Sequence, residues 1–392
     1  MSPYFEWILI GWSLVAFCWW GITVWLVSRE CRKPHLPKAS ASGVARSNPP
    51  PLSIFKPIPS LRGDTPSSQL VRALESFVSQ LSKDAEMLLG IEDTEAQTWG
   101  PVIERWQRDY PRAMVNVIIT PRPAQFHSPK VSWFHYLARY AKGEVWLWSD
   151  ADIVAPDGSL EAMRREFSES GAGMLTCPYV VRGAGFAPMM LEALFVNMEF
   201  YPGVLFCRQM GPVEFGLGPA MMFSAARFHE RAQWEKLGMR MADDNALGRA
   251  LAPVRVSETT MVTFSAESFW RGAIEHYFRW QKTVRWCQPV GFAGLIIIQP
   301  MLGWLAAVVL HPLNPVAWLG LAATGQIEVL TAMTLFWLIG CELRSWWVVT
   351  LWSLLLRPLT WVACWMPWPV VFRSQKRKWW SLYRSVPLEG EA

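Results

Sequence analysis

Residues 143–158 read GEVWLWSDADIVAPDG, and this stretch indicates the fold more clearly than any other part of the sequence. Its apolar run VWLW, at 145–148, predicts a buried strand. Asp150 and Asp152 follow at the point where that strand ends. Carboxylates in such a position either form an ordinary turn or bind a metal ion. The rest of the chain has to decide between these two interpretations.

The chain between Leu52 and about Leu251 alternates between short apolar runs and helical patterns. LSIFKP is followed by LVRALESFVSQL, MLLGIED by WGPVIERW, and MVNVIIT by VSWFHYLARYA. Such strand–helix repetition predicts a parallel sheet with helices on both faces. Ligands bind these sheets at the carboxyl ends of the strands. Both Asp93 and the Asp150/Asp152 pair fall at such ends.

The two ends of the chain are far more hydrophobic than its middle. Residues 5–27 are nearly uncharged, and about 20 helical residues suffice to cross a hydrocarbon core of about 30 Å. A cleaved signal peptide would carry basic residues before its apolar run, whereas here they come after it, at Arg29, Arg32, Lys33 and Lys38. We therefore predict a transmembrane anchor, in preference to a buried core helix. Its N-terminus lies outside, and the chain that follows is cytoplasmic.

Hydrophobicity returns after Trp286. Residues 288–310 and 315–340 are plausible spans, the second of which carries Glu328. A third apolar stretch, 346–372, is interrupted by Arg357 and Pro358 and is followed by a basic tail. Three complete spans would place that tail outside, against the positive-inside tendency. We therefore expect two spans plus an interfacial or re-entrant segment, with the tail in the cytoplasm.

Net charge and cysteine content further restrict the class of protein. The chain has 37 basic and 32 acidic residues, a net charge of +5 that is too small to indicate nucleic-acid binding. Its seven cysteines form no CxxC pair and indicate free thiols.

The expected organisation is a transmembrane anchor at 1–28, a Pro/Ser/Ala-rich linker at 29–51, a catalytic domain at 52–286, a C-terminal membrane region at 287–372 and a basic tail at 373–392.

Three further groups of residues accompany the Asp150/Asp152 pair. Asp93 ends the strand MLLGIED. Asp243 and Asp244 stand in MADDNALGRAL, at the start of a predicted helix where capping is the ordinary role of an acidic residue. HYFRWQKTVRW, at 276–286, combines aromatic and cationic side chains just before the membrane region. An interfacial anchor is the alternative interpretation of that last segment.

Taken in order, these groups are a first Asp, a DxD, a third Asp in an (E/D)D pair and a (Q/R)xxRW-like segment. This order resembles membrane-bound GT-A glycosyltransferases of the ceramide glucosyltransferase type, including the related bacterial hopanoid-biosynthesis glycosyltransferases. The resemblance runs from about Leu52 to Trp286 and includes the stretches FKP, SPKV with Lys130, TCPYVVRGAG, LEALFVNMEFYPGVLF and GLGPAMMFSAARF. It implies an α/β fold, a GT-A domain with a Rossmann-like mixed sheet, flanked by N-terminal and C-terminal transmembrane helices.

The resemblance also implies roles for the acidic residues. Asp93 corresponds to the Asp that contacts the nucleotide, with Glu95 as the alternative match. In the DxD, Asp150 would bind the sugar-nucleotide and Asp152 a divalent cation, Mg²⁺ or Mn²⁺. Asp244 matches the general base.

The other implied site residues contact the substrate. Asp243 replaces the more usual Glu of the (E/D)D pair, and Lys130 belongs to the same set. His276, Arg279 and Trp280 match the (Q/R)xxRW element, although His stands where Gln or Arg is usual.

The implied reaction is an inverting transfer of a hexose, with glucose expected, from a UDP-sugar to the hydroxyl of a membrane lipid such as ceramide or a hopanoid. The protein would be integral to the membrane, the inner membrane in a bacterium, with its catalytic domain in the cytoplasm. The main alternative is a processive polysaccharide synthase, which shares the aspartates but usually has more membrane helices and a clear QxxRW. A non-catalytic scaffold is a third possibility, and the presence of all the expected carboxylates counts against it.

Overall fold

The structure, a computed structural model, describes residues 1–33, 50–61, 64–183, 187–264, 269–341 and 344–366. The chain divides into two compact units. The first, the helical unit, contains residues 1–33, 181–205 and 265–392, and the second, the α/β unit, contains residues 34–180 and 206–264. Most of the predicted linker and the whole basic tail fall outside the described residues.

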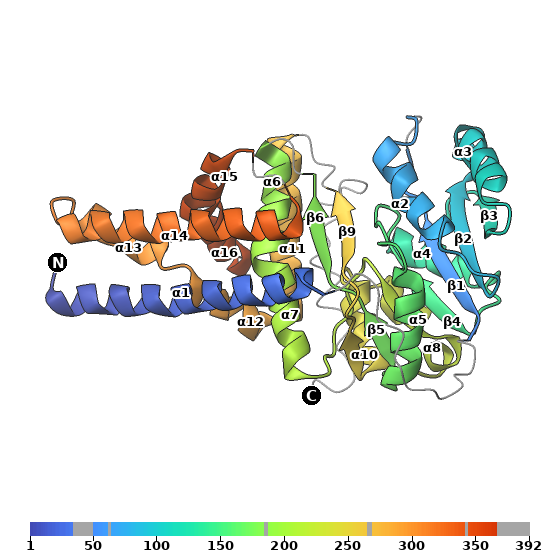
Figure 1. The fold of residues 1–392 in the computed structure, drawn as a ribbon, viewed down its shortest axis with the longest axis horizontal. Coiled ribbons are helices and arrows are strands. Elements are labelled where there is room, and N and C mark those ends of the chain that lie inside the picture. The colour runs from blue at the N-terminus through green and yellow to red at the C-terminus, as the bar shows by residue number, and fades with distance from the viewer. Residues whose placement is uncertain (34–49, 62–63, 184–186, 265–268, 342–343, 367–392) are drawn as a thin grey trace. The chain divides into compact units, whose positions relative to one another are not determined.

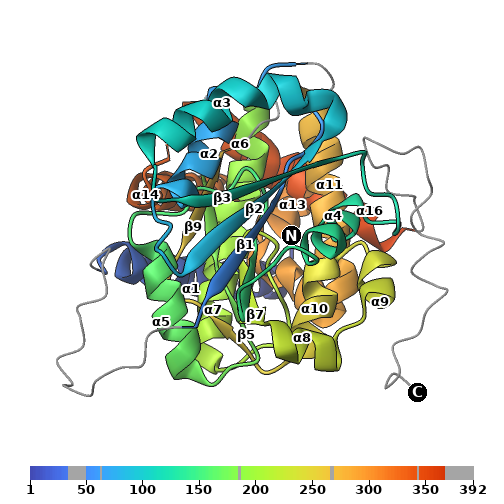
Figure 2. The same ribbon diagram turned by 90° about the vertical axis from the view of Figure 1, so that its right-hand side faces the viewer.

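The α/β unit is built on one seven-stranded sheet in the order β3-β2-β1-β4-β7-β5-β8. Strands β3, β2 and β1 lie side by side in Figure 2. Its strands are β1 (Leu52–Pro57), β2 (Ala85–Glu92), β3 (Met114–Thr120), β4 (Val145–Trp148), β5 (Met174–Thr176), β7 (Met221–Ser224) and β8 (Val254–Val256). Strands β1 to β4 are parallel, as predicted. The strand–helix pattern, which predicted a parallel sheet, did not reveal that β7 runs antiparallel to both β4 and β5. The resulting mixed sheet is the one that the GT-A resemblance implied.

Helices cover both faces of this sheet. Along β1, Ile54 belongs to one hydrophobic core and Phe55 to the other, because successive side chains of a strand point to opposite faces. The first core also contains side chains of α2 (Ser68–Val78), α3 (Ala96–Asp109) and α5 (Ser159–Ser170). The second contains side chains of α4 (Pro129–Leu137), α8 (Ala225–Arg231), α9 (Trp234–Gly238) and α10 (Asp243–Leu251). Strands β6 (Tyr179–Arg182) and β9 (Met261–Phe264) stand outside the large sheet.

The helical unit contains the apolar ends of the chain. Its elements are α1 (Pro3–Cys31), α6 (Ala187–Leu194), the π-helical turn η2 (Phe195–Phe200), the start of α7 (Tyr201–Met210), α11 (Trp270–Cys287), α12 (Pro289–Gly294), η3 (Leu295–Ile298), α13 (Met301–Leu310), α14 (Pro315–Ile339), α15 (Trp346–Leu351), the π-helical turn η4 (Trp352–Leu356) and α16 (Arg357–Trp365). Helices α1 and α14 run side by side (Figure 1). Trp304 of α13 packs with them and donates a hydrogen bond to Ser13 Oγ at 2.8 Å.

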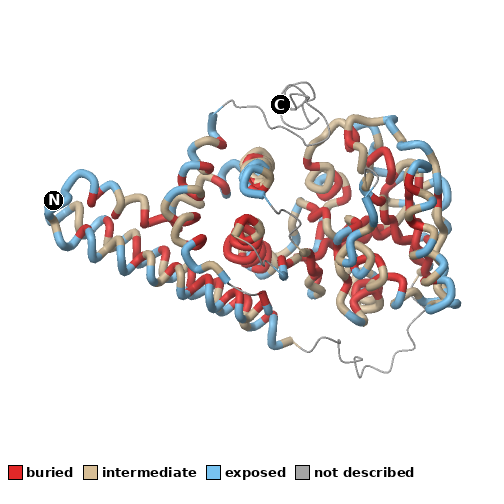
Figure 3. The backbone as a smooth tube through the Cα atoms, turned by 90° about the horizontal axis from the view of Figure 1, so that it is seen from above, coloured by how far each residue is buried: buried red, intermediate tan, exposed pale blue. Residues whose placement is uncertain are grey.

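Among the described residues, four helical stretches are long and apolar enough to cross a membrane: Pro3–Cys31, Ala187–Met210, Pro315–Ile339 and Trp346–Trp365. A fifth, Pro289–Ile298 with Met301–Leu310, is bent by 55°. Many large apolar side chains of α1 and α14 are exposed, Trp7 and Trp337 among them. In Figure 3, exposed residues along the helix that begins at the N-terminus are drawn in pale blue. Exposed large apolar side chains along the length of a helix indicate contact with lipid or with another protein.

The C-terminal apolar stretches differ in where their helices bend. A bend lies in the first of them, at 289–310, whereas Trp346–Trp365 is long enough to cross. Helical structure continues past Pro358, because the π-helical turn η4 leads directly into α16. Arg357 is buried in ion pairs. The sequence pattern around these two residues therefore marked a polar contact inside the helical unit, and not an interruption.

Candidate active site

The turn after β4 carries Asp150 and Asp152. Ala151 and Ile153 are buried in the core beneath it, so the two carboxylates alternate with residues that anchor the turn. Asp150 is half-buried and Asp152 is exposed. Lys130, in the first turn of α4, forms a 2.5 Å ion pair with Asp150 Oδ1. Both acidic side chains therefore lie just beyond the carboxyl end of β4, as predicted.

Gly218 marks the place where three of the predicted residues meet. A Cβ atom at this position would lie 3.2 Å from Lys130 Nζ, 3.3 Å from Asp150 Oδ2 and 3.4 Å from Asp244 Oδ2. The Gly218 backbone N–H donates to Asp244 Oδ2 at 3.0 Å. The DxD turn, α4 and the start of α10 thus converge on one glycine. Sequence analysis noted the stretch GLGPA but assigned Gly218 no part in the site.

Asp243 and Asp244 occupy the first turn of α10. Neither caps the helix in the usual way, because the residue at the cap position is Ala242. Asp244 Oδ1 accepts a hydrogen bond from the backbone N–H of Asn245 at 2.7 Å. Asp243 Oδ2 is buried and has no hydrogen-bond partner among the described residues. An orphaned carboxylate oxygen of this kind is costly unless a ligand satisfies it.

The carboxylates change each other's protonation. Burial, together with the charges of Asp244 and Asp150, raises the pKa of Asp243 to about 6 against the opposing effect of Lys130. Burial also raises the pKa of Asp244. Burial alone would lower the pKa of Lys130, but Asp150 and Asp243 hold that pKa above its usual value. Lys130 therefore stays cationic at neutral pH.

Asp152 shows a related shift. Desolvation and the neighbouring charge of Asp150 raise the pKa of Asp152 to about 6. Two acidic groups that repel each other gain from a bound cation.

A metal ion at this site would need oxygens from a ligand. Within the residues that the structure describes, no three Asp, Glu, His or Cys side chains lie close enough together to hold one. Asp150 and Asp152 nevertheless supply hard oxygen ligands on one turn, and Mg²⁺ is usually bound by one or two carboxylates plus substrate phosphates. The residues present therefore fit a cation that arrives with a sugar diphosphate.

Asp93 and Glu95, the two alternatives for the first Asp, have different surroundings. Asp93 is exposed, and its Oδ1 accepts a hydrogen bond from the backbone N–H of Thr94 at 2.8 Å. Glu95 is buried, and its Oε1 accepts hydrogen bonds from Ser60 Oγ at 2.9 Å and from the backbone N–H of Leu61. Glu95 thus fixes the loop after β1, and Asp93 keeps a carboxylate available for a ligand.

His276, Arg279 and Trp280 lie on α11, in the helical unit. The His276 and Trp280 rings are tilted by 53° with centroids 4.2 Å apart, and the Trp280 ring also lies 5.8 Å from the Phe195 ring. The Arg279 carbonyl accepts a hydrogen bond from Thr283 Oγ1. The structure thus groups these three residues on one helix.

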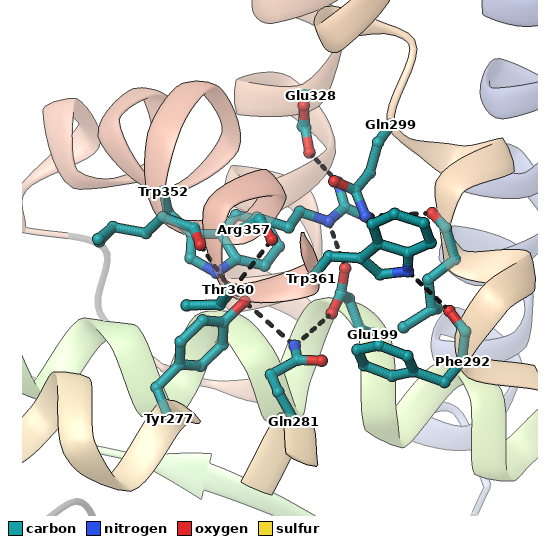
Figure 4. A network of polar contacts seen from close by, with 12 residues as sticks. Glu199, Tyr277, Gln281, Phe292, Gln299, Glu328, Trp352, Arg357, Thr360 and Trp361 are labelled. Carbon is teal, nitrogen blue, oxygen red and sulfur yellow. Dashed lines mark hydrogen bonds and ion pairs between the residues drawn. The ribbon is translucent and has the colours of Figure 1, made fainter. Parts of the chain in front are cut away.

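The helical unit also contains a buried ionic network that sequence analysis did not predict (Figure 4). Arg357 is ion-paired with Glu199 and, at 2.6 Å, with Glu328. Gln281 donates to Glu199 at 3.5 Å and to the Tyr277 hydroxyl at 3.1 Å. The signal was present, since Glu328 and Arg357 are isolated charges in apolar stretches, and such charges normally pair.

A comparison with protein families now identifies the chain. Residues 8–376 match the model of Glycosyl transferase family 21. The chain belongs to this family. The resemblance to glycosyltransferases of the ceramide glucosyltransferase type is thereby confirmed, as is the expectation that the protein is a glycosyltransferase.

Solved structures show weaker similarity. A mannosyltransferase from Pyrobaculum calidifontis, in complex with GDP-Man and Mn²⁺, is 17% identical with a TM-score of 0.46, covering 92% of this chain and 97% of that one. TarS residues 1–349 from S. aureus, in complex with UDP-GlcNAc, is 13% identical with a TM-score of 0.35, covering 80% of this chain and 79% of that one. A comparison with curated protein sequences gives no match.

Proposed function

We propose that this glycosyltransferase moves a hexose, glucose in the first instance, from a UDP-sugar to the hydroxyl of a membrane lipid. The single observation that carries the proposal is the convergence of Lys130, Asp150 and Asp244 around Gly218, next to the accessible carboxylate of Asp152. A cationic group, a metal-binding turn and a carboxylate base are the parts that an inverting transfer from a sugar diphosphate needs.

The donor would bind over the DxD turn. Asp152 would hold Mg²⁺ or Mn²⁺, and Asp150 the sugar-nucleotide, while Lys130 offsets charge on the diphosphate. The cation, when bound, would stabilise the negative charge that develops on the UDP leaving group. The sugar then lies near Gly218, where the lack of a side chain leaves room beside Asp244.

Asp244 would act as the general base. The acceptor hydroxyl oxygen attacks the anomeric carbon, its proton passes to the Asp244 carboxylate, and the bond from that carbon to the UDP oxygen breaks with inversion. The raised pKa of Asp244 makes it a better proton acceptor than an ordinary carboxylate. The hydrogen bond from Gly218 fixes one oxygen of the base, and the N–H of Asn245 fixes the other.

The apolar helices provide the reason for a lipid acceptor. With α1, α14 and the stretch Trp346–Trp365 in the bilayer, a lipid hydroxyl could react at headgroup level without leaving the membrane. We further propose that His276, Arg279 and Trp280 contact the substrate and that the α/β unit is cytoplasmic. The orientation is tested by cysteine labelling of intact cells from outside, which should reach a site engineered near Ser2 but none between residues 64 and 180.

The function is tested with the full chain in lipid nanodiscs, UDP-glucose, Mn²⁺ and separate acceptors: ceramide, a hopanoid, a sterol and diacylglycerol. Mass spectrometry should find one acceptor that gains a single hexose, attached with inverted anomeric configuration. A ladder of hexose additions would instead indicate a polysaccharide synthase. Absence of transfer from UDP-glucose and from UDP-N-acetylglucosamine to every acceptor would contradict the proposal.

A further inference from the structure

Lys56, near the end of β1, is a buried lysine to which the reaction above assigns no role. Its side chain is 0% exposed, and lysine is almost never fully buried unless it is paired. Its Nζ donates to Ser149 Oγ at 2.9 Å and to the Asp150 carbonyl at 2.7 Å. It also lies 3.5 Å from the centroid of the Phe77 ring. The three N–H groups of the ammonium thus have two oxygens and one aromatic face to contact.

These contacts continue to the other side of the site. Ser149 Oγ donates its hydrogen to the Pro219 carbonyl at 2.6 Å. The preceding residue, Gly218, donates its backbone N–H to Asp244 Oδ2 at 3.0 Å. A continuous path of short contacts therefore leads from Lys56, through Ser149 and the Gly218–Pro219 loop, to Asp244. The same ammonium holds the backbone of the DxD turn at Asp150.

We propose that Lys56 is the positioning residue that joins the DxD turn to the loop holding the base. Its ammonium is enclosed by protein, so it acts through the residues that it contacts and not on the substrate itself. This inference rests on the proposed function, because it assumes that Asp150 and Asp152 bind the donor and its cation.

The test must separate positioning from ordinary packing. Lys56→Met keeps an unbranched apolar stem and removes the ammonium. We expect the Kd for UDP with Mn²⁺, measured by calorimetry, and the donor KM to rise about ten- to hundredfold, the size expected for losing hydrogen bonds to a charged group. The acceptor KM should stay within about twofold of wild type. A packing role alone would lower the amount of folded protein and leave these constants unchanged.

Two further variants complete the design. Leu89→Ala removes a buried side chain of β2 that pairs in register with Lys56, so it loses packing without losing a hydrogen bond and should keep the wild-type Kd. Ser149→Ala removes the hydrogen bonds that the hydroxyl makes with Lys56 and with Pro219 but leaves the bond from Lys56 to the Asp150 carbonyl. It should therefore raise the Kd by less than Lys56→Met. The double variant of Lys56 and Ser149 should show less than the product of the two effects, because both act on one path.

A wild-type Kd and donor KM in Lys56→Met would overturn the inference. If Lys56→Met does not fold, Ser149→Ala decides, and wild-type constants in that variant overturn it equally. The proposed function has its own failure signature. A wild-type protein that binds UDP with Mn²⁺ but glycosylates no lipid would contradict the reaction, while the binding data would still decide the role of Lys56.

Discussion

The backbone N–H of Gly218 holds one carboxylate oxygen of Asp244 at 3.0 Å. This contact joins the loop before β7 to the first turn of α10. It also places the proposed base within the same small space as Lys130 and Asp150. A Cβ at this position would lie 3.2 Å from Lys130 Nζ and 3.3 Å from Asp150 Oδ2, so these side chains would have to shift slightly to make room for it.

Gly218→Ala should therefore lower activity without unfolding the protein. The added methyl forces Lys130, Asp150 or Asp244 to move by a few tenths of an ångström, and displacements of this order reduce rates about tenfold or more. Steady-state kinetics and a thermal melt measure the two effects. Gly100→Ala is the matched control, because nothing lies within 4 Å of that added methyl. Equal kinetics for the two variants would show that the space at Gly218 is not needed.

Asp244→Asn should reduce turnover by about 10²–10⁴, because the amide keeps the shape but cannot accept a proton. The affinity for UDP-sugar should change little, since the DxD turn is untouched. Asp243→Asn should lower turnover much less. Glycolipid formation and donor affinity are measured side by side for both variants. If Asp243→Asn were the inactive one, the two residues would have exchanged roles.

Asp152→Asn should abolish metal-dependent activity and leave the fold intact, because its side chain is exposed and supports no core packing. Wild-type turnover should vanish on adding EDTA and return with Mn²⁺ or Mg²⁺. Circular dichroism checks the fold of the variant. Full turnover in Asp152→Asn, with an unchanged response to EDTA, would remove this residue from the cation site.

The pH dependence of stability should reveal the buried carboxylate of Asp243. Its pKa rises from 3.8 unfolded to about 6 folded, so the folded state binds the proton more tightly. The stability from this protonated form is complete below pH 4 and is lost as pH rises through about 6. Without divalent cations, Asp243→Asn should therefore match wild type near pH 4. Near pH 7 it should be more stable by about 1–3 kcal/mol.

Thermal unfolding midpoints of both proteins between pH 4 and 8 provide the measurement. Lys130, Asp244 and Asp150 are the charged groups that act on Asp243, and all three are present in both proteins. A difference that is constant across this range would mean that Asp243 does not titrate on folding.

Arg357 should matter more for stability than either of its partners. Arg357→Met leaves Glu199 and Glu328 buried together without a cation, and breaking a buried ion pair in this way costs about 3–5 kcal/mol. Glu328→Gln leaves the pair with Glu199 intact and should cost less. Thermal unfolding in detergent ranks the two variants. A greater loss in Glu328→Gln would show that the network depends on that contact and not on the arginine.

Much of the fold could be read from local patterns. The run VWLW, the strand–helix alternation and the apolar stretch at 5–27 each depend on neighbouring residues, and each predicted element is present. The direction of β7 was not predictable in this way. An apolar run such as MMFS has the same pattern whether its strand runs parallel or antiparallel to β4, and only the path of the connecting chain decides it.

The candidate site, too, was predictable from the sequence only in part. The sequence shows which residue types the site contains: two carboxylates follow a strand, and two more stand at the start of a helix. Both pairs belong to short motifs, so local sequence was enough to find them. Their arrangement around Gly218 and above Lys56 joins β1, β4, α4 and α10, which are far apart along the chain. The ion pairs of Arg357 likewise join residues 29 or more positions away. Local sequence determined which segments form strands and helices, whereas side-chain contacts between distant segments were decided only when the chain packed.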